Sequence, residues 1–356
     1  MKVIFLNIAA LLIAQLAICQ SGIIITTKPG KIFIERGENK QIINSDFLVT
    51  NSSSDTFTLS KISVRVFDKD NVLVHSRFLD NNGTSPSILV IPNRKFNGAS
   101  SQLIFNPFTD FSATLPIDKL MYEFIFEAND GREIIGKATV VPTLFVQKEA
   151  FAFPLKGMVL VYDAHDLYAH HRRFDYEFAP IKGLGIKTNF MRYAFDFVFV
   201  EGDKQFKTDG KQDEDYFGWG KPVYSIGAGK VIYASNVHKD DKTFNIPGIA
   251  TNALELYGNC VAILHNDSSV SIFGHLKQNS IRLKEGDIVK AGQEIAAIGV
   301  SGSSFFPHLH FELRTSIDHS AEGLPVYFSN VFLLEGKKKL KISSGLVETG
   351  NIIEAR

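Results

Sequence analysis

Two histidines are separated by a single residue in the segment 307–313, Pro-His-Leu-His-Phe-Glu-Leu. Polar and apolar residues alternate here, so a β-strand would place His308, His310 and Glu312 on one face and apolar side chains on the other. Two neighbouring imidazoles could both bind a metal, or one could bind it while the other transfers a proton. Glu312 either supports a metal ligand or faces solvent. The His-x-His spacing alone is weak evidence for a site, because it also occurs on solvent-exposed faces of strands.

The distribution of histidine along the chain points to the same region. One histidine, His75, lies in the first half, and the other nine follow residue 160. Histidine serves as a metal ligand and as an acid or base near neutral pH, so the second half is where we expect a site of this kind.

The elements around the His-x-His strand are predicted to be short strands joined by glycine turns. Residues 221–232 indicate a strand, a turn and a strand, and residues 259–275 indicate a hairpin that ends at His275. Residues 285–295 form another turn-rich β unit. A loop of small residues, 299–304, directly precedes the His-x-His strand.

This order of elements resembles the lysostaphin and LytM type of zinc metallopeptidase, whose members cut the cross-linking peptides of bacterial cell walls. The resemblance covers about residues 165–330 and rests on the combined motifs. It implies a lipoyl-like antiparallel β-sheet domain, a bound Zn2+ ion, and peptidoglycan or a muropeptide as substrate.

The resemblance also implies roles for individual residues. His310 matches a zinc ligand, and Asp196, in the segment 192–197, matches the carboxylate ligand. His308 matches one catalytic histidine. His275, in Gly-His-Leu, matches the other.

The first ligand departs from the usual pattern of a histidine four residues before the aspartate, because Arg192 occupies that position. In one branch of the family a histidine followed by arginines lies farther upstream, and His171 before Arg172 and Arg173 resembles it. The alternative is His170. In an extended segment adjacent side chains point to opposite faces, so only one of the two would reach the metal. The two arginines would contact an acidic substrate group or solvate a loop.

The implied ligand set determines the chemistry. Two imidazoles and one carboxylate leave a position on zinc open for water, which is the catalytic arrangement. A water bound there ionises near about pH 7 and can attack a carbonyl polarised by the metal. His308 or His275 would transfer the proton and stabilise developing charge. The sequence has no His-Glu-x-x-His motif, which excludes the zinc proteases that use that glutamate as a base.

A chain of 356 residues is too long for one ordinary core, so we expect two domains, both mainly β. Short alternating runs between turns predict an immunoglobulin-like antiparallel β-sandwich over residues 22–142. Residues 143–155 would be a linker and residues 156–335 the LytM-type peptidase domain. A tail, 336–356, would follow.

The first residues predict export. Lys2 precedes an apolar run, 3–18, that is short for a membrane span and typical of a signal peptide over residues 1–19. The mature chain would begin near Gln20 without a transmembrane span, in the periplasm or cell envelope. A lipid anchor at Cys19 is the alternative. Cleavage after Cys19 leaves Cys260 as the remaining cysteine, so an intrachain disulfide is excluded.

Three functions remain open. Lys and Arg balance Asp and Glu at 38 each, so we expect no nucleic-acid partner. The first hypothesis is an exported zinc endopeptidase. The second is a catalytically silent relative that binds cell wall or activates another hydrolase. The third is a lipoyl-like or biotinyl-like carrier, because residues 227–231 and 289–294 are similar to strands of that fold, although a carrier would not need the His-x-His strand.

Overall fold

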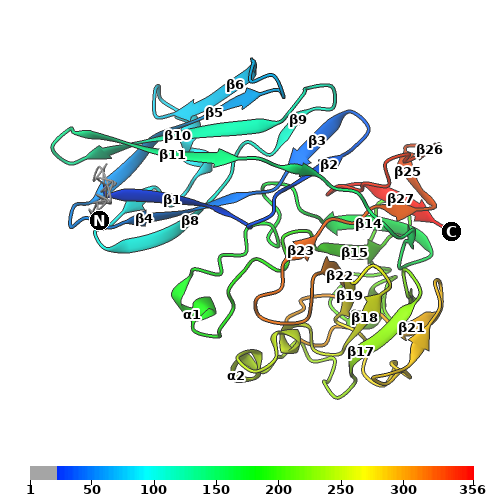
Figure 1. The fold of residues 1–356 in the computed structure, drawn as a ribbon. Coiled ribbons are helices and arrows are strands. Elements are labelled where there is room, and N and C mark those ends of the chain that lie inside the picture. Colours follow the sequence, from blue (N-terminus) through cyan, green and yellow to red (C-terminus); the bar gives the residue numbers. More distant parts are fainter. Residues whose placement is uncertain (1–21) are drawn as a thin grey trace, which may run out of the picture.

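The computed structural model describes residues 22–356, so the signal peptide and lipid-anchor predictions on residues 1–19 lie outside the described residues. The described chain is mainly β, as predicted, and its two α-helices have four residues each (Figure 1). Over these residues no helix has the length and apolar character needed to cross a membrane. The helices are α1 (Ala179–Lys182) and α2 (Ile246–Ile249).

The N-terminal half consists of β-sheets that face one another around an apolar interior, and their strands pair antiparallel except β12 with β2, which are parallel (Figure 1). One sheet has the order β11-β10-β5-β6 with β7 beside β5, another the order β1-β4-β8, and a third the order β12-β2-β3-β9. The bounds are β1 (Ile23–Lys28), β2 (Phe33–Arg36), β3 (Lys40–Ile43), β4 (Asp46–Asn51), β5 (Phe57–Phe67), β6 (Leu73–Asp80), β7 (Lys95–Phe96), β8 (Ser100–Phe105), β9 (Asp110–Ser112), β10 (Lys119–Ala128), β11 (Glu133–Val140) and β12 (Thr143–Leu144).

The alternating pattern of β10 explains why this half folds as a sandwich. Tyr122, Phe124 and Phe126 are buried, while the residues between them are partly exposed. In the paired strand β5 the register places Ile62 opposite Phe124, so apolar side chains meet on one face. Period-2 burial is what an antiparallel sheet with one covered face requires.

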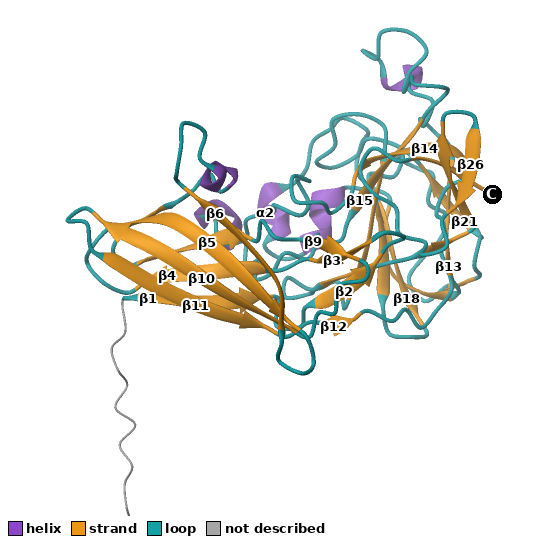
Figure 2. Cartoon of the chain, turned by 90° about the horizontal axis from the view of Figure 1, so that it is seen from above, coloured by secondary structure: helices purple, strands orange, loops and turns teal. Residues whose placement is uncertain are grey.

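The C-terminal half is organised around one eleven-stranded sheet, whose strands pair antiparallel. Its order is β20-β17-β18-β19-β22-β15-β14-β27-β25-β26, with β23 beside β22. Figure 2 shows this half beside the N-terminal half, seen from above. The bounds are β13 (Phe151–Ala152), β14 (Gly157–Asp163), β15 (Phe195–Phe199), β16 (Pro222–Tyr224), β17 (Gly229–Ser235), β18 (Cys260–His265), β19 (Val270–Gly274), β20 (Ile288–Val289), β21 (Glu294–Ala297), β22 (Leu309–Arg314), β23 (Gly323–Leu324), β24 (Phe328–Ser329), β25 (Val331–Glu335), β26 (Lys338–Lys341) and β27 (Ile352–Ala355).

Two segments outside the predicted peptidase domain contribute to its sheet and core. Residues 336–356, predicted as a tail, contain β26 and β27, and β27 pairs with both β14 and β25. Ile353 is fully buried there. In the predicted linker, Phe151, Phe153 and Leu155 pack into the same core. Apolar burial therefore extends the core beyond both predicted bounds, because these short runs lie against strands far away in the sequence.

Candidate metal centre

The strand β22 lies between β19 and β15, and this register assembles the site. His310 is opposite Gly274 of β19 on one side and opposite Asp196 of β15 on the other. His275 directly follows β19, at the end of the predicted hairpin. The alternation predicted for this strand is confirmed: Leu309, Phe311 and Leu313 belong to the apolar core, and the histidine face is turned away from it.

Three imidazole nitrogens surround one carboxylate oxygen of Asp196. The Oδ1 atom lies 3.2 Å from His310 Nδ1, 3.4 Å from His308 Nε2 and 3.6 Å from His171 Nε2. All four side chains are buried. Burial alone would raise the pKa of Asp196, but the neighbouring imidazoles hold that pKa well below its ordinary value. Asp196 is therefore an anion placed to share a cation with the histidines.

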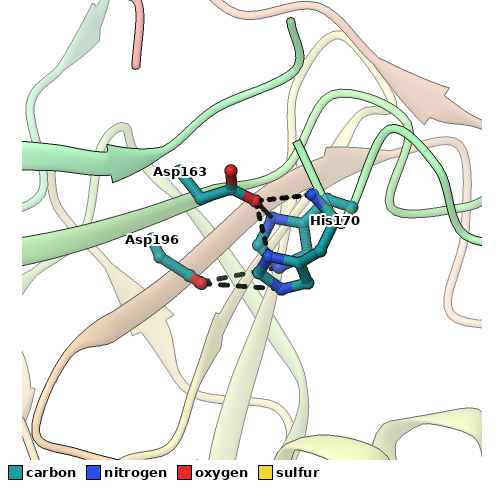
Figure 3. Close-up of side chains that lie close together, drawn as sticks. Asp163, His170 and Asp196 are labelled. Atoms are coloured by element: carbon teal, nitrogen blue, oxygen red, sulfur yellow. Dashed lines mark hydrogen bonds and ion pairs between the residues drawn. The ribbon is translucent and has the colours of Figure 1, made fainter. Parts of the chain in front are cut away.

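Of the two candidate first ligands, His170 faces Asp196 (Figure 3), and His171 also lies beside it, with Nε2 3.6 Å from Asp196 Oδ1. The expectation that they point to opposite faces was wrong, because this segment is a turn and not an extended strand. Their ring centroids are 3.8 Å apart. His171 is buried, whereas the His170 side chain is 66% exposed, with its Nε2 3.7 Å from Asp196 Oδ2.

Asp163 is a site residue that the sequence reasoning missed. Its Oδ2 lies 2.6 Å from His170 Nδ1 and 3.3 Å from His171 Nδ1 (Figure 3). Asp163, His170, His171 and Asp196 together form a group whose ligand atoms lie within 4.8 Å of one another. The one signal in the sequence was an acidic residue at the end of an apolar strand, since β14 places Asp163 opposite Asp196.

The predicted catalytic histidines lie side by side, with ring centroids 4.9 Å apart. His275 Nδ1 is 2.8 Å from the Ser301 carbonyl oxygen, and His308 Nδ1 is 2.8 Å from that of Phe306. A carbonyl can only accept, so the Nδ1 atom of each ring carries a proton. Burial, reinforced by the nearby imidazoles, lowers the pKa of His275 well below its ordinary value, so this ring is neutral at pH 7.

A second layer of buried polar groups supports His310 from behind. Glu312 Oε1 lies 3.5 Å from His310 Nε2 and 2.5 Å from Arg314 Nη2, which also donates to the Tyr257 hydroxyl. The Tyr257 ring stacks on the His310 ring at 4.5 Å. Glu312 is fully buried, so the alternative that it faces solvent was wrong.

These charges act on both partners. Burial opposes ionisation of Glu312, but Arg314 and His310 lower its pKa to about 2. Burial likewise disfavours the charged form of His310, yet Asp196 and Glu312 raise the pKa of this imidazole to about 9. Glu312 is therefore ionised, and its negative charge stabilises either a proton on His310 or a metal ion bound to it.

The donor set fits zinc. His171, Asp196 and His310 offer two imidazole nitrogens and one carboxylate oxygen around a common point, the ligand types of catalytic zinc sites. Asp163 behind His171 and Glu312 behind His310 match the carboxylates that orient zinc-binding histidines in such sites.

Two other buried side chains bind groups outside the candidate metal centre. The expectation that Arg172 contacts substrate or solvates a loop was wrong, because its side chain is fully buried and binds Asp46 of the N-terminal half. His265 is buried at the end of β18, with its ring nitrogens 2.9 Å from the Ala228 carbonyl and 2.8 Å from Ser271 Oγ.

Residues 215–322 match the model of peptidase family M23. The lipoprotein NlpD of Yersinia enterocolitica is 36% identical over 95 residues, which are 27% of this chain and 78% of that protein. The murein hydrolase activator NlpD of Escherichia coli is 35% identical over 95 residues, 27% of this chain and 20% of that protein. The chain belongs to peptidase family M23.

Among solved structures, the catalytic domain of lysostaphin from Staphylococcus simulans is 26% identical, with a TM-score of 0.25, over 37% of this chain and 74% of that one. The segment matched by the family model contains His275, His308 and His310. It begins after His171 and Asp196, so these two residues come from a part of the chain outside the match.

Proposed function

We propose that this chain is an exported zinc metalloendopeptidase that hydrolyses the peptide cross-links of bacterial peptidoglycan. The observation that carries the proposal is the convergence of His171, His308 and His310 on one oxygen of Asp196, at 3.2 to 3.6 Å. Membership of peptidase family M23 supports the reaction class.

His171, Asp196 and His310 would hold the zinc ion. When bound, zinc would lower the pKa of a water molecule and polarise the scissile carbonyl. His275 and His308 would transfer the proton, because their rings lie beside each other, with centroids 4.9 Å apart, and His275 is neutral at pH 7. Once protonated, either imidazole could donate to the developing oxyanion or to the leaving amine.

The substrate and compartment rest on the relatives. Several are named as lipoproteins, and others as murein hydrolase activators. With the predicted signal peptide, these names support a location in the cell envelope and a peptidoglycan substrate. The zinc assignment rests on this chain's own residues.

The alternative is a catalytically silent protein that binds cell wall and activates another hydrolase. The names of the Salmonella and Escherichia relatives favour it. Against it, this chain carries a residue for each role in the proposed reaction: His171, Asp196, His275, His308 and His310.

Two measurements on the purified mature protein test the choice. We expect about one zinc per chain by metal analysis, and new muropeptides with free amino ends after incubation with purified peptidoglycan. His310→Ala should lose both properties, while His75→Ala, in the N-terminal half, should keep both. Zinc binding without any cleavage product would favour the silent protein, and metal retained at full stoichiometry by His310→Ala would contradict the ligand assignment.

A further inference from the structure

A single carboxylate of the N-terminal half binds two arginines of the C-terminal half. Asp46, the first residue of β4, has Oδ1 2.5 Å from Arg172 Nη1 and Oδ2 2.5 Å from Arg192 Nη1. None of the three side chains is more than 1% exposed. Away from water an ion pair is screened little and holds its partners in one geometry.

The rest of the Arg172 guanidinium is also bound by the N-terminal half. Its Nε donates to Asn44 Oδ1 at 3.0 Å and its Nη2 to the Ser45 carbonyl at 2.8 Å. All three nitrogens of this side chain are therefore fixed by the connection between β3 and β4. Since Arg172 directly follows His171, the position of the candidate first ligand depends on residues about 126 positions earlier in the chain.

A second contact fixes the other end of the same turn. His165 Nε2 lies 3.1 Å from Glu35 Oε2 of β2, and both side chains are buried. Asn44 Nδ2 donates to the other Glu35 oxygen at 3.4 Å, which connects the two contacts. The turn 165–172, which carries both His170 and His171, is thus held at both ends by the N-terminal half.

Arg192 strengthens the case, because it lies four residues before Asp196, at the position where the resemblance described above implies a first ligand. Here its guanidinium faces Asp46 and not the metal centre. Asp46 therefore binds both Arg192, which occupies the expected ligand position, and Arg172, which directly follows the candidate ligand His171.

We propose that the metal centre of this chain is assembled across its two halves, with Asp46 as a positioning residue that holds His171 in place to bind the metal. The inference rests on the proposed function, because it takes His171 as a ligand. It gives the N-terminal β half a role in positioning a ligand of the metal centre.

The test compares zinc affinity in full-length variants by competition with a chromophoric chelator, with the absorption spectrum of the Co2+ form as a readout of the ligand set. Asp46→Asn should weaken zinc binding about 10- to 100-fold, the range seen when outer partners of a ligand are lost. The matched control is Asp55→Asn, which breaks an exposed pair with Arg132 in the same half and should leave zinc affinity unchanged.

A double-mutant cycle separates positioning from general destabilisation. If Asp46 acts through His171, then Asp46→Asn should have no further effect on the residual zinc affinity of the His171→Ala variant. An equal loss in both backgrounds would overturn the proposal, as would wild-type affinity and an unchanged Co2+ spectrum in folded Asp46→Asn protein.

A milder variant covers the case in which Asp46→Asn does not fold. Asn44→Ala removes the hydrogen bond from Arg172 and the longer one to Glu35 but keeps both ion pairs of Asp46, so we expect a folded protein with zinc affinity about threefold to tenfold lower. Unchanged affinity in this variant would count against the proposal. If the wild-type protein itself binds no zinc, the proposed function fails first; if wild type binds zinc and the Asp46 and Asn44 variants bind it equally well, the inference alone fails.

Discussion

Strands β10 and β22 are both central strands of antiparallel sheets, yet they bury their side chains differently. In β10 buried apolar residues alternate with partly exposed ones such as Glu123. In β22 every residue is buried, including His310, Glu312 and Arg314. Burying a polar group without a partner costs free energy, and on the covered polar face of β22 Glu312 and Arg314 pair with each other.

The comparison extends to the buried charges of the two halves. Glu35 and Asp46 are buried acids of the N-terminal half, and both bind residues of the C-terminal turn 165–172. The charges of β22, by contrast, bind one another and the candidate ligand His310. The buried acids of the N-terminal half thus bind the turn that carries His171, and those of β22 act on His310, while the sandwich interior around β10 is apolar.

The largest expected effect is the loss of cleavage activity when His275, a proposed proton-transferring residue of the C-terminal half, is replaced. A histidine of the N-terminal half serves as the comparison. His275→Ala should lower the rate of peptidoglycan cleavage about 10³-fold, because it removes a group that acts on the transferred proton. Zinc should stay bound, since His275 lies outside the proposed ligand set. Muropeptide release and metal content measure the two properties, with His75→Ala as the control. Equal loss of zinc would move His275 into the ligand set.

A stability measurement sharpens the contrast between the two strands. Glu312→Gln leaves Arg314 as a buried charge without its carboxylate and should lower the free energy of unfolding by about 3–5 kcal/mol. The same substitution at Glu123, whose partner Lys137 is exposed at 3.8 Å, should cost less than about 1 kcal/mol. Urea unfolding of the metal-free proteins gives both values. Similar losses would mean that the buried pair of Glu312 and Arg314 contributes no more to stability than the exposed pair of Glu123 and Lys137.

Local patterns in the sequence were enough to predict the strand alternation of β22 and the hairpin that ends at His275. Both depend on residues two positions apart or on one turn, so periodicity reveals them. The residues that contact the turn 165–172 could not be predicted from local patterns. Asp163 reaches His171 through the pairing of β14 with β15, and Arg172 reaches Asp46 from 126 positions away. A single sequence carries no local signal for contacts of that separation.

The pH dependence of zinc binding should reflect His310. Because Asp196 and Glu312 raise its pKa to about 9 against the burial that opposes them, this imidazole is protonated in the metal-free protein at pH 7. Its charged form contributes stability below the unfolded-state pKa of about 6.5, and that contribution is lost as the pH rises through about 9. Zinc must displace the proton, so zinc affinity should rise about tenfold per pH unit up to pH 9.

Isothermal titration in buffers of different ionisation enthalpy would count the released proton. About one proton per zinc at pH 7 is expected. In Glu312→Gln the pKa of His310 should fall, and the rise of affinity with pH should level off at a lower pH. A flat affinity between pH 6.5 and 9 in the wild type would contradict the assignment of His310 as a ligand.

The smallest expected effect is that of His170→Ala on zinc affinity, and it distinguishes His170 from its neighbour His171. His171 is buried with Nε2 3.6 Å from Asp196 Oδ1, so His171→Ala removes one of three ligands and should weaken zinc binding at least 100-fold. His170 is largely exposed and faces the other oxygen at 3.7 Å. Its removal leaves Asp163 free to accept from His171 Nδ1, 3.3 Å away, so His170→Ala should change zinc affinity less than about threefold. Paired affinity measurements test this ranking. The reverse order would identify His170 as the ligand. If neither substitution changed zinc affinity, the hypothesis of a catalytically silent protein would be favoured.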